Sequence, residues 1–299
     1  MCSVKPPNDL SHKGVAIEEW VDLRFFRPIG IRIARALEPT GISADQVTLW
    51  CILIGLVAGH LFLYRDPWVN AIGFVLFIVS DIFDSADGQL ARLRGTSTRF
   101  GRSLDGIGDH LRFVNLYVHL AIRLMLAGWH WYGLLLAALA GLSHALQSMA
   151  ADFIRNAYLT IGEGSTGEVD LPEDLPAAGQ GTLLQRFAAA VYANYVLRQT
   201  WLFPRTVDLL RQLRRVHIAP SFRAAYRERQ QPLLPLCSWL GQNIRFALLG
   251  FAGIAGHPSA YLWTEVLAMN LLLFVVLQPS HEANSGALST ALEREASAY

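Results

Sequence analysis

Apolar residues along the chain gather into six stretches, each long enough or nearly long enough to cross a hydrocarbon core of about 30 Å as a helix. They cover residues 47–64, 68–91, 104–127, 129–157, 236–256 and 259–278. None is uniformly apolar, because the second ends in acidic residues, the third begins with them, and the fourth and fifth carry polar groups. The pattern predicts an all-α polytopic membrane protein with six transmembrane helices.

The segment before the first stretch mixes aromatic and basic side chains. In residues 15–38, Trp20, Phe25 and several aliphatic residues are interleaved with four arginines. Such a sequence is typical of an N-terminal amphipathic helix in the membrane interface, where each arginine near anionic headgroups contributes on the order of 1 kcal/mol. A helix packed on a cytosolic domain is the alternative. The N-terminal residues lack the apolar run of a signal peptide, so no cleaved signal is expected.

The pattern divides the chain into five parts. These are a cytoplasmic arm with the interfacial helix (1–40), transmembrane helices 1–4 (41–157), a cytoplasmic or interfacial insertion (158–235), transmembrane helices 5–6 (236–279) and a cytoplasmic tail (280–299). Within the insertion, glycine, proline and acidic residues predict a loop over 160–183. Residues 187–203 are apolar but short and contain Arg198, which predicts an interfacial or cytosolic helix.

The overall composition agrees with a membrane protein. Apolar residues make up 53% of the chain and charged residues 16%, against about 25% charged in an average soluble protein, and the mean hydropathy is +0.31. These values exclude intrinsic disorder, a coiled coil and an ordinary cytosolic enzyme. The net charge of +1 gives no indication of nucleic-acid binding. Three cysteines, Cys2, Cys51 and Cys237, are too few and too scattered for a disulfide or metal framework.

The placement of the arginines predicts the orientation. Four of them lie in the link between the second and third stretches: Arg92, Arg94, Arg99 and Arg102. Nine more lie in residues 158–235, whereas the links after the third and fifth stretches hold no lysine or arginine. Because cytoplasmic loops are enriched in basic residues, both termini and the arginine-rich link are expected in the cytoplasm, with only Arg65 on the opposite side. The expected location is a bacterial inner membrane.

Four acidic residues flank the link between the second and third stretches. Asp84 and Asp87 are three positions apart, and Asp105 and Asp109 are four apart. On a helix, residues at these spacings share a face, and the short link folds the two helices back as neighbours. The sequence therefore predicts that four carboxylates converge at the cytoplasmic boundary of the membrane.

Such a group of carboxylates requires protons or cations, because like charges near a bilayer are costly. All-oxygen ligation suits Mg²⁺ or Mn²⁺, and four carboxylates suit two ions. Two ions about 3.5–4 Å apart serve displacement at phosphorus. On the same faces Gly88, Ala91 and Gly101 leave room for a phosphate-bearing ligand, and Arg92 can bind a phosphate. The alternatives are solvated acids at helix ends and glycines that serve helix packing.

The spacing Asp-x2-Asp-Gly-x2-Ala-Arg-x8-Gly-x3-Asp-x3-Asp is present without a gap. The eight matching positions are Asp84, Asp87, Gly88, Ala91, Arg92, Gly101, Asp105 and Asp109. The pattern resembles the signature of the CDP-alcohol phosphotransferase family, also called the CDP-alcohol phosphatidyltransferase family. Residues 42–56 are also similar to the family's lead-in to its first span, although Ala44 and Asp45 stand where the family usually has Pro-Asn.

The resemblance implies an integral-membrane transferase of phospholipid biosynthesis with six transmembrane helices, usually a homodimer. Such an enzyme moves a substituted phosphate group from a CDP-linked donor, either CDP-diacylglycerol or a CDP-alcohol, to an alcohol hydroxyl and releases CMP. One of the two substrates is a lipid. The resemblance assigns Asp84, Asp87 and Asp105 as ligands of Mg²⁺ or Mn²⁺, Asp109 as the base that also touches the second ion, and Gly88, Ala91, Arg92 and Gly101 as contacts of the CDP group.

Further polar residues lie inside the fourth and fifth stretches. Because ionisable groups within a membrane usually face an interior cavity, Arg155 and Arg245 are candidates for binding a phosphate or a polar headgroup. A structural ion pair, such as Asp152 with Arg155, is the alternative. Asp81, one turn before Asp84, has no assigned role.

Two other functions stay open from the sequence. An intramembrane prenyltransferase also binds Mg²⁺-diphosphate with acidic pairs, but normally on helices far apart in sequence. A cation transporter would use the acids as its pathway, but here they cluster at one end of two helices.

Overall fold

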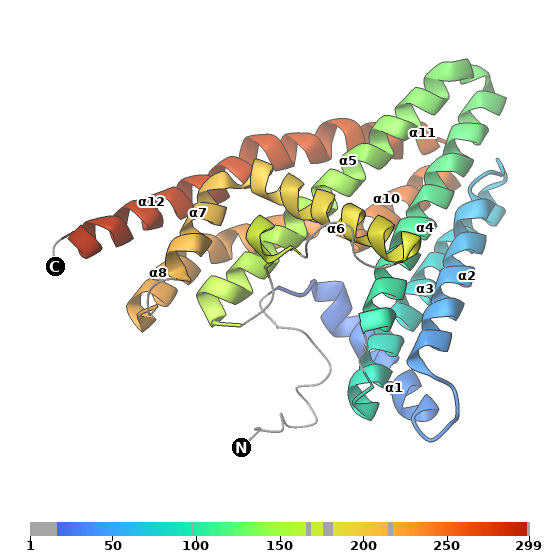
Figure 1. Cartoon of the computed structure of the whole chain (residues 1–299). Coiled ribbons are helices and arrows are strands. Elements are labelled where there is room, and N and C mark those ends of the chain that lie inside the picture. The colour runs from blue at the N-terminus through green and yellow to red at the C-terminus, as the bar shows by residue number, and fades with distance from the viewer. Residues whose placement is uncertain (1–16, 97–98, 166–168, 176–181, 215–217, 298–299) are drawn as a thin grey trace. The chain divides into compact units, whose positions relative to one another are not determined.

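The computed structural model describes residues 17–96, 99–165, 169–175, 182–214 and 218–297, without the side chains of 99–105, 183–185, 187–188 and 295–297. Within these ranges the chain is helical and contains no strand, which confirms the all-α prediction. The helices, labelled as in Figure 1, are α1 (Arg27–Leu37), α2 (Ala44–Leu61), α3 (Pro67–Arg94), α4 (Arg99–Leu124), α5 (His130–Ala157), α6 (Leu183–Leu202), α7 (Pro204–Leu213), α8 (Pro220–Gln230), α9 (Leu234–Trp239), α10 (Gln242–Ile254), α11 (Pro258–Trp263) and α12 (Gln278–Ser297). Short π-helical segments lie at Asp22–Phe26, Met125–Trp129, Tyr158–Glu163, Thr264–Met269 and Leu272–Leu277, and 3₁₀ turns at Pro172–Asp174 and Gln231–Leu233.

The chain forms two compact units. The first comprises Met1–His144 and Gln242–Leu267, and the second comprises Ala145–Gly241 and Ala268–Tyr299. Helices α3 and α4, which carry the acidic motif, belong to the first unit.

Four helical segments in the described part of the chain are long and apolar enough to cross a membrane. They are Ala44–Leu61, Pro67–Arg94, Gly106–Glu163 and Pro258–Arg294. The third has 58 residues and breaks at Gly128, whose φ of 91° interrupts the helix between the predicted spans 104–127 and 129–157. The four segments support a membrane protein, and α6 is not one of them.

The six predicted spans are not confirmed. The predicted span 236–256 is divided into α9 and α10, and α10 has only 13 residues. At 1.5 Å per residue it reaches about 20 Å, which is short of a hydrocarbon core of about 30 Å. The last predicted span, 259–278, instead belongs to a segment that runs on to Arg294, so residues expected in a cytoplasmic tail are helical.

Local sequence signals explain where the helices of the motif begin and end. Ser43 and Gln46 form a capping box at the start of α2, which satisfies N–H groups that the first turn leaves unpaired. Asp66 accepts hydrogen bonds from two backbone N–H groups at the start of α3, and Pro67 occupies the first turn. Gly95 ends α3 with a φ of 65°, a conformation that glycine adopts without strain.

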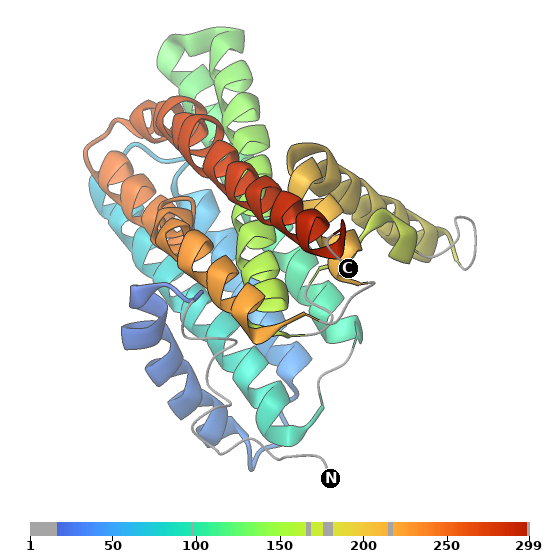
Figure 2. The same ribbon diagram turned by 90° about the vertical axis from the view of Figure 1, so that its left-hand side faces the viewer.

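Helix α1 packs along α3, as Figure 2 shows for the dark blue helix at the N-terminal end. Gly30 allows the close approach, since a Cβ there would lie 2.8 Å from the Ser85 hydroxyl. Ala34 joins a buried cluster with Leu90 and other apolar residues of α2 and α3. The buried face of α1 thus has a protein partner. A placement of its exposed aromatic neighbour Trp20 in the membrane interface stays a prediction.

Helices α2, α3 and α4 pack closely in the first unit (Figure 1). Small residues make the contacts possible: a Cβ on Gly59 of α2 would lie 2.6 Å from the Asn115 amide nitrogen of α4, and a Cβ on Gly108 would lie 2.6 Å from the Ile52 side chain. The core beside them is aromatic, with Phe77 stacked on Phe246 at 4.5 Å between ring centroids. This packing fixes the ends of α3 and α4 that carry the acidic residues.

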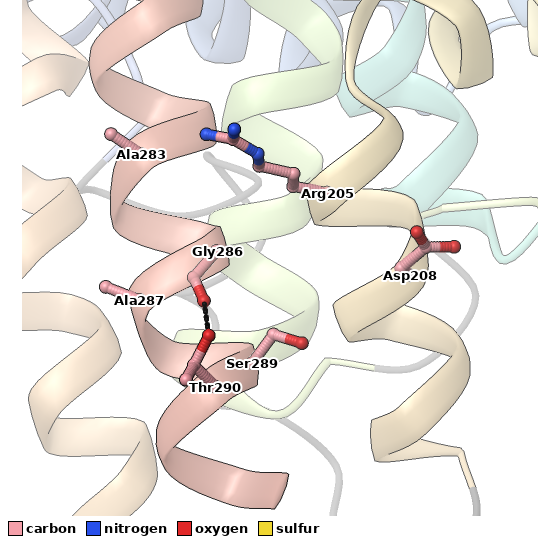
Figure 3. Close-up of a pocket in the computed structure, with 7 residues that line it drawn as sticks. All are labelled: Arg205, Asp208, Ala283, Gly286, Ala287, Ser289 and Thr290. Atoms are coloured by element: carbon pink, nitrogen blue, oxygen red, sulfur yellow. Dashed lines mark hydrogen bonds between the residues drawn. The ribbon is translucent and has the colours of Figure 1, made fainter.

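In the second unit, α12 packs on α7 and α8. Glu282 of α12 accepts hydrogen bonds from the backbone N–H groups of Arg205 and Thr206 and so caps α7. A cleft of about 470 Å³ lies between α7 and α12, as Figure 3 shows, and Arg205 extends across it. None of the residues that line this cleft was predicted as a site residue.

Candidate active site

The last turns of α3 present one partly exposed face. Asp84, Gly88, Ala91 and Arg92 all lie on it and are half-buried. The Arg92 guanidinium folds over Gly88, because a Cβ on Gly88 would lie 3.4 Å from Arg92 Nη1. Because Gly88 has no side chain, the Arg92 guanidinium can lie against the backbone there, on the same face of α3 as Asp84.

Asp87, three residues after Asp84 on α3, is buried. Its Oδ2 atom accepts a hydrogen bond of 2.5 Å from Thr48 Oγ1 of α2. A hydrogen bond to a buried carboxylate is among the stronger ones in proteins, so Thr48 fixes the Asp87 carboxylate against α2.

Helix α4 carries the second half of the motif. Asp109 lies on it with a side chain that is 41% exposed. Gly101 and Asp105 also lie in α4, but the Asp105 side chain and the surroundings of Gly101 are outside the described part of the structure. The convergence of all four predicted carboxylates thus remains a prediction.

Arg112 of α4 connects the two helices. Its side chain is 1% exposed. Atom Nη2 donates to Oδ1 of Asp109 and, at 3.5 Å, to Oδ1 of Asp84. The other terminal nitrogen, Nη1, donates to Ser80 Oγ at 2.8 Å and to Asp81 Oδ1 at 3.3 Å. The first half of the motif on α3 and the second half on α4 therefore meet at one guanidinium.

Neighbouring residues make room for Arg112 and complete its surroundings. A Cβ on Gly55 of α2 would lie 2.3 Å from Arg112 Cδ, so only glycine leaves space for the arginine stem. Gln242, at the start of α10, donates a hydrogen bond of 2.6 Å to Asp81 Oδ1. Asp81, which the sequence left without a role, is thereby held by both α4 and α10.

Three acidic side chains surround Arg112. Three carboxylates, of Asp81, Asp84 and Asp109, contact one guanidinium. Two of them keep a partly exposed side chain, 37% for Asp84 and 41% for Asp109. An excess of accessible carboxylate oxygens next to a buried arginine is a suitable setting for a further hard cation.

Arg155 and Arg245 occupy different environments. Arg245 of α10 is fully buried, and its Nη1 donates to Oε2 of the equally buried Glu265, which favours the alternative of a structural ion pair. Arg155 is partly buried and donates to Ser238 Oγ at 3.5 Å. Its role in phosphate or headgroup binding stays a prediction.

Comparison with known proteins decides the family. The sequence profile described as CDP-alcohol phosphatidyltransferase matches residues 42–203, more than half of the chain and the whole of the motif. The chain belongs to the CDP-alcohol phosphatidyltransferase family. Membership in this family agrees with the long apolar helices and explains why the motif residues occur at these spacings along α3 and α4.

Two curated relatives show the same similarity. An archaetidylinositol phosphate synthase of Pyrococcus horikoshii is 26% identical over 137 residues, which are 46% of this chain and 70% of that protein. A bifunctional IPC transferase and DIPP synthase of Aquifex aeolicus is 27% identical over 155 residues, which are 50% of this chain and 34% of that protein. At these identities the relatives support a phospholipid-type transferase without defining the substrates.

CDP-alcohol phosphatidyltransferases generally use a divalent metal ion. Among the side chains that the structure describes, no group of three or more His, Cys, Asp or Glu residues is placed to hold one. The donor chemistry nevertheless fits, because Asp84 and Asp109 offer hard, partly exposed oxygens. Asp105 completes the spacing of the motif, and its side chain lies outside the described part of the structure.

Sequence reasoning missed three residues that shape the site: Thr48, Gly55 and Arg112. Arg112 stands three positions after Asp109, a spacing at which side chains share a helix face. This spacing is a signal that could have identified it. Thr48 and Gly55 act from α2, and nothing in their local sequence indicates which helix faces them.

Proposed function

We propose that this protein is an integral-membrane CDP-alcohol phosphotransferase that transfers a substituted phosphate group from a CDP-linked donor to an alcohol hydroxyl and releases CMP. The observation that carries the proposal is the meeting of Asp84 and Asp109, from the two halves of the family motif, at Arg112. Family membership supports the reaction class. One relative is named an archaetidylinositol phosphate synthase, and for this reason inositol phosphate is the first acceptor to test.

The proposed reaction is a displacement at phosphorus. The alcohol oxygen attacks the phosphorus that carries the donor's lipid or alcohol group, and its proton passes to the Asp109 carboxylate. The bond from this phosphorus to the bridging oxygen breaks, and CMP leaves with the electron pair. Arg92 holds the CDP phosphates together with Gly88, Ala91 and Gly101, which have little or no side chain.

The proposed metal ligands are Asp84, Asp87, Asp105 and Asp109. When bound, Mg²⁺ or Mn²⁺ would supply positive charge that stabilises the diphosphate and the leaving CMP. The residues themselves present oxygen ligands from adjoining helices. The arginine-rich link between α3 and α4 supports a cytoplasmic position for this site and for both termini.

The test is CMP release by the purified protein in lipid nanodiscs. CDP-diacylglycerol and CDP-alcohols are offered as donors, with inositol phosphate, glycerol phosphate and serine as acceptors. We expect metal-dependent CMP release with one donor and acceptor pair, loss of release in Asp84→Asn, and retention in Asp208→Asn, which changes an exposed acid of the second unit.

Other outcomes would contradict the proposal. No CMP release with any pair, combined with cation flux in liposomes, would identify a transporter. Release of inorganic diphosphate from a prenyl diphosphate would identify a prenyltransferase instead.

A further inference from the structure

We infer that Arg112 is a positioning residue with two roles. It sets the spacing of the carboxylates on α3 and α4, and its positive charge limits the affinity of the site for metal ions so that they can exchange. The inference deepens the proposed function and rests on it. It assigns a role to a residue outside the eight positions of the motif.

Arg112 contacts both halves of the motif. One nitrogen, Nη2, contacts a carboxylate oxygen from each helix, Asp84 Oδ1 on α3 and Asp109 Oδ1 on α4. The planar fork of the guanidinium places Nη1 against Ser80 and Asp81 while Nη2 contacts the other two carboxylates. The single ammonium of lysine has no second nitrogen to anchor it in this way. Arg112 therefore defines how far apart the two halves of the site stand.

Burial makes the placement rigid. Arg112 is among the largest fully buried side chains of the described part, and its stem fills the space that Gly55 leaves on α2. Ser80 and Asp81 hold its second terminal nitrogen from α3. A buried arginine held from two helices cannot move away without breaking several contacts.

The charge of Arg112 acts on any cation at the site. It lies in direct contact with Asp84 and Asp109, which are also the proposed metal ligands. At such short distances its positive charge repels a cation that binds to the same carboxylates. Removal of this charge should therefore strengthen cation binding by about tenfold or more, provided that the helices stay folded.

Arg123 offers a matched control on the same helix. It is also buried, at 4% exposure, but it donates to uncharged partners, the Phe62 carbonyl oxygen at 3.1 Å and Asn70 Oδ1 at 2.7 Å. A variant there loses buried hydrogen bonds of an arginine without changing the charge next to the motif.

The experiment compares the wild-type protein with R112Q, R112K and R123Q. Mn²⁺ affinity is measured by titration, with the electron paramagnetic resonance signal of the free ion as the readout. The values of kcat and KM and the unfolding temperature are measured on the same proteins. For R112Q we expect Mn²⁺ to bind about tenfold more tightly while kcat falls by about 100-fold, since a displacement of about 1 Å costs that much. R112K should keep the wild-type Mn²⁺ affinity within about threefold and lose about tenfold in kcat. R123Q should lower the unfolding temperature and leave Mn²⁺ affinity unchanged.

The opposite results would overturn the inference. Weaker or unchanged Mn²⁺ binding in folded R112Q would show that the arginine serves only packing. If R112Q does not fold, R112K decides, because wild-type kcat in that variant would show that the fork geometry has no role. Absence of CMP release by the wild-type protein would overturn the proposed function, whereas the Mn²⁺ titration reports on Arg112 by itself.

Discussion

The carboxylates of the motif have different partners. Asp87 is buried and bound to Thr48, whereas Asp84 and Asp109 are partly exposed and share Arg112. A buried carboxylate that is held by a hydrogen bond keeps one orientation, which suits a metal ligand. A partly exposed carboxylate where two helices meet is accessible to a substrate hydroxyl. Asp84 and Asp109 both meet this condition, and of the two we propose Asp109 as the base.

Replacement of Asp109 by asparagine should lower kcat by roughly 10²–10⁴-fold, because the amide cannot accept the proton of the attacking hydroxyl. The KM for the CDP-linked donor should change by less than about threefold. Initial rates of CMP release across donor concentrations measure both constants. A variant that kept more than a tenth of wild-type kcat would exclude Asp109 as the base.

Replacement of Thr48 by valine keeps the shape of the side chain but removes the hydrogen bond to Asp87. We expect a loss of about 1.5–3 kcal/mol in stability, the usual cost of deleting a hydrogen bond to a buried charged group. The midpoint of chemical unfolding in detergent measures the effect. Thr40→Val is the control, since the Thr40 hydroxyl is exposed and contacts only backbone groups of its own turn. Equal midpoints for the two variants would contradict the assigned contact.

At the scale of elements, α2 makes room for the Arg112 side chain of α4 at Gly55. Gly55→Ala would place a methyl group 2.3 Å from Arg112 Cδ, which forces either the arginine or the helix to move. We expect a loss of about 1–3 kcal/mol in stability, typical of an overpacked core, together with a fall in kcat. Gly41→Ala is the control, because nothing lies within 4 Å of a Cβ there. Wild-type activity and stability in Gly55→Ala would show that the predicted crowding is absent.

A second element contact, outside the apolar segments, has a defined pH dependence. The turn Pro172–Asp174 is joined to the end of α7 by Arg214, which donates to the Asp174 carboxylate at 2.8 and 2.6 Å. Hydrogen bonding to Arg214 lowers the pKa of Asp174 below its usual 3.8. A carboxylate with a lowered pKa in the folded state stabilises the fold above its unfolded pKa, and this contribution disappears as the pH falls through the folded value.

Asp174→Asn should therefore lower the unfolding temperature slightly at pH 7, since the pair is exposed and screened. The difference from the wild-type protein should shrink as the pH is lowered below 3.8. Thermal unfolding of the two proteins at a series of pH values tests this. A difference that stayed constant down to pH 3 would mean that Asp174 is not ionised in the pair.

For the whole molecule, the sequence predicted the all-α class and the family motif well, but it predicted the ends of the helices poorly. Residues 84–109 predicted adjoining helices and an acidic site, because helix periodicity and the short link determine which residues share a face. The division of 236–256 into α9 and α10 was not predicted, since an apolar run gives no signal for a bend that tertiary contacts such as Gln242 with Asp81 stabilise. The role of Arg112 depends on a gap at Gly55, a contact between helices that no local pattern contains.

Metal binding provides a test on the whole protein. If the carboxylates of α3 and α4 bind Mn²⁺ only when the helices are folded together, Mn²⁺ stabilises the folded state by about 2.7 kcal/mol at 100 times its dissociation constant. We expect EDTA to lower the unfolding temperature and to abolish CMP release, and excess Mn²⁺ or Mg²⁺ to restore both. Asp84→Asn should reduce this metal-dependent rise in unfolding temperature, whereas Asp208→Asn should retain it. If EDTA changed neither the unfolding temperature nor the rate of CMP release, that result would contradict a metal site in this protein.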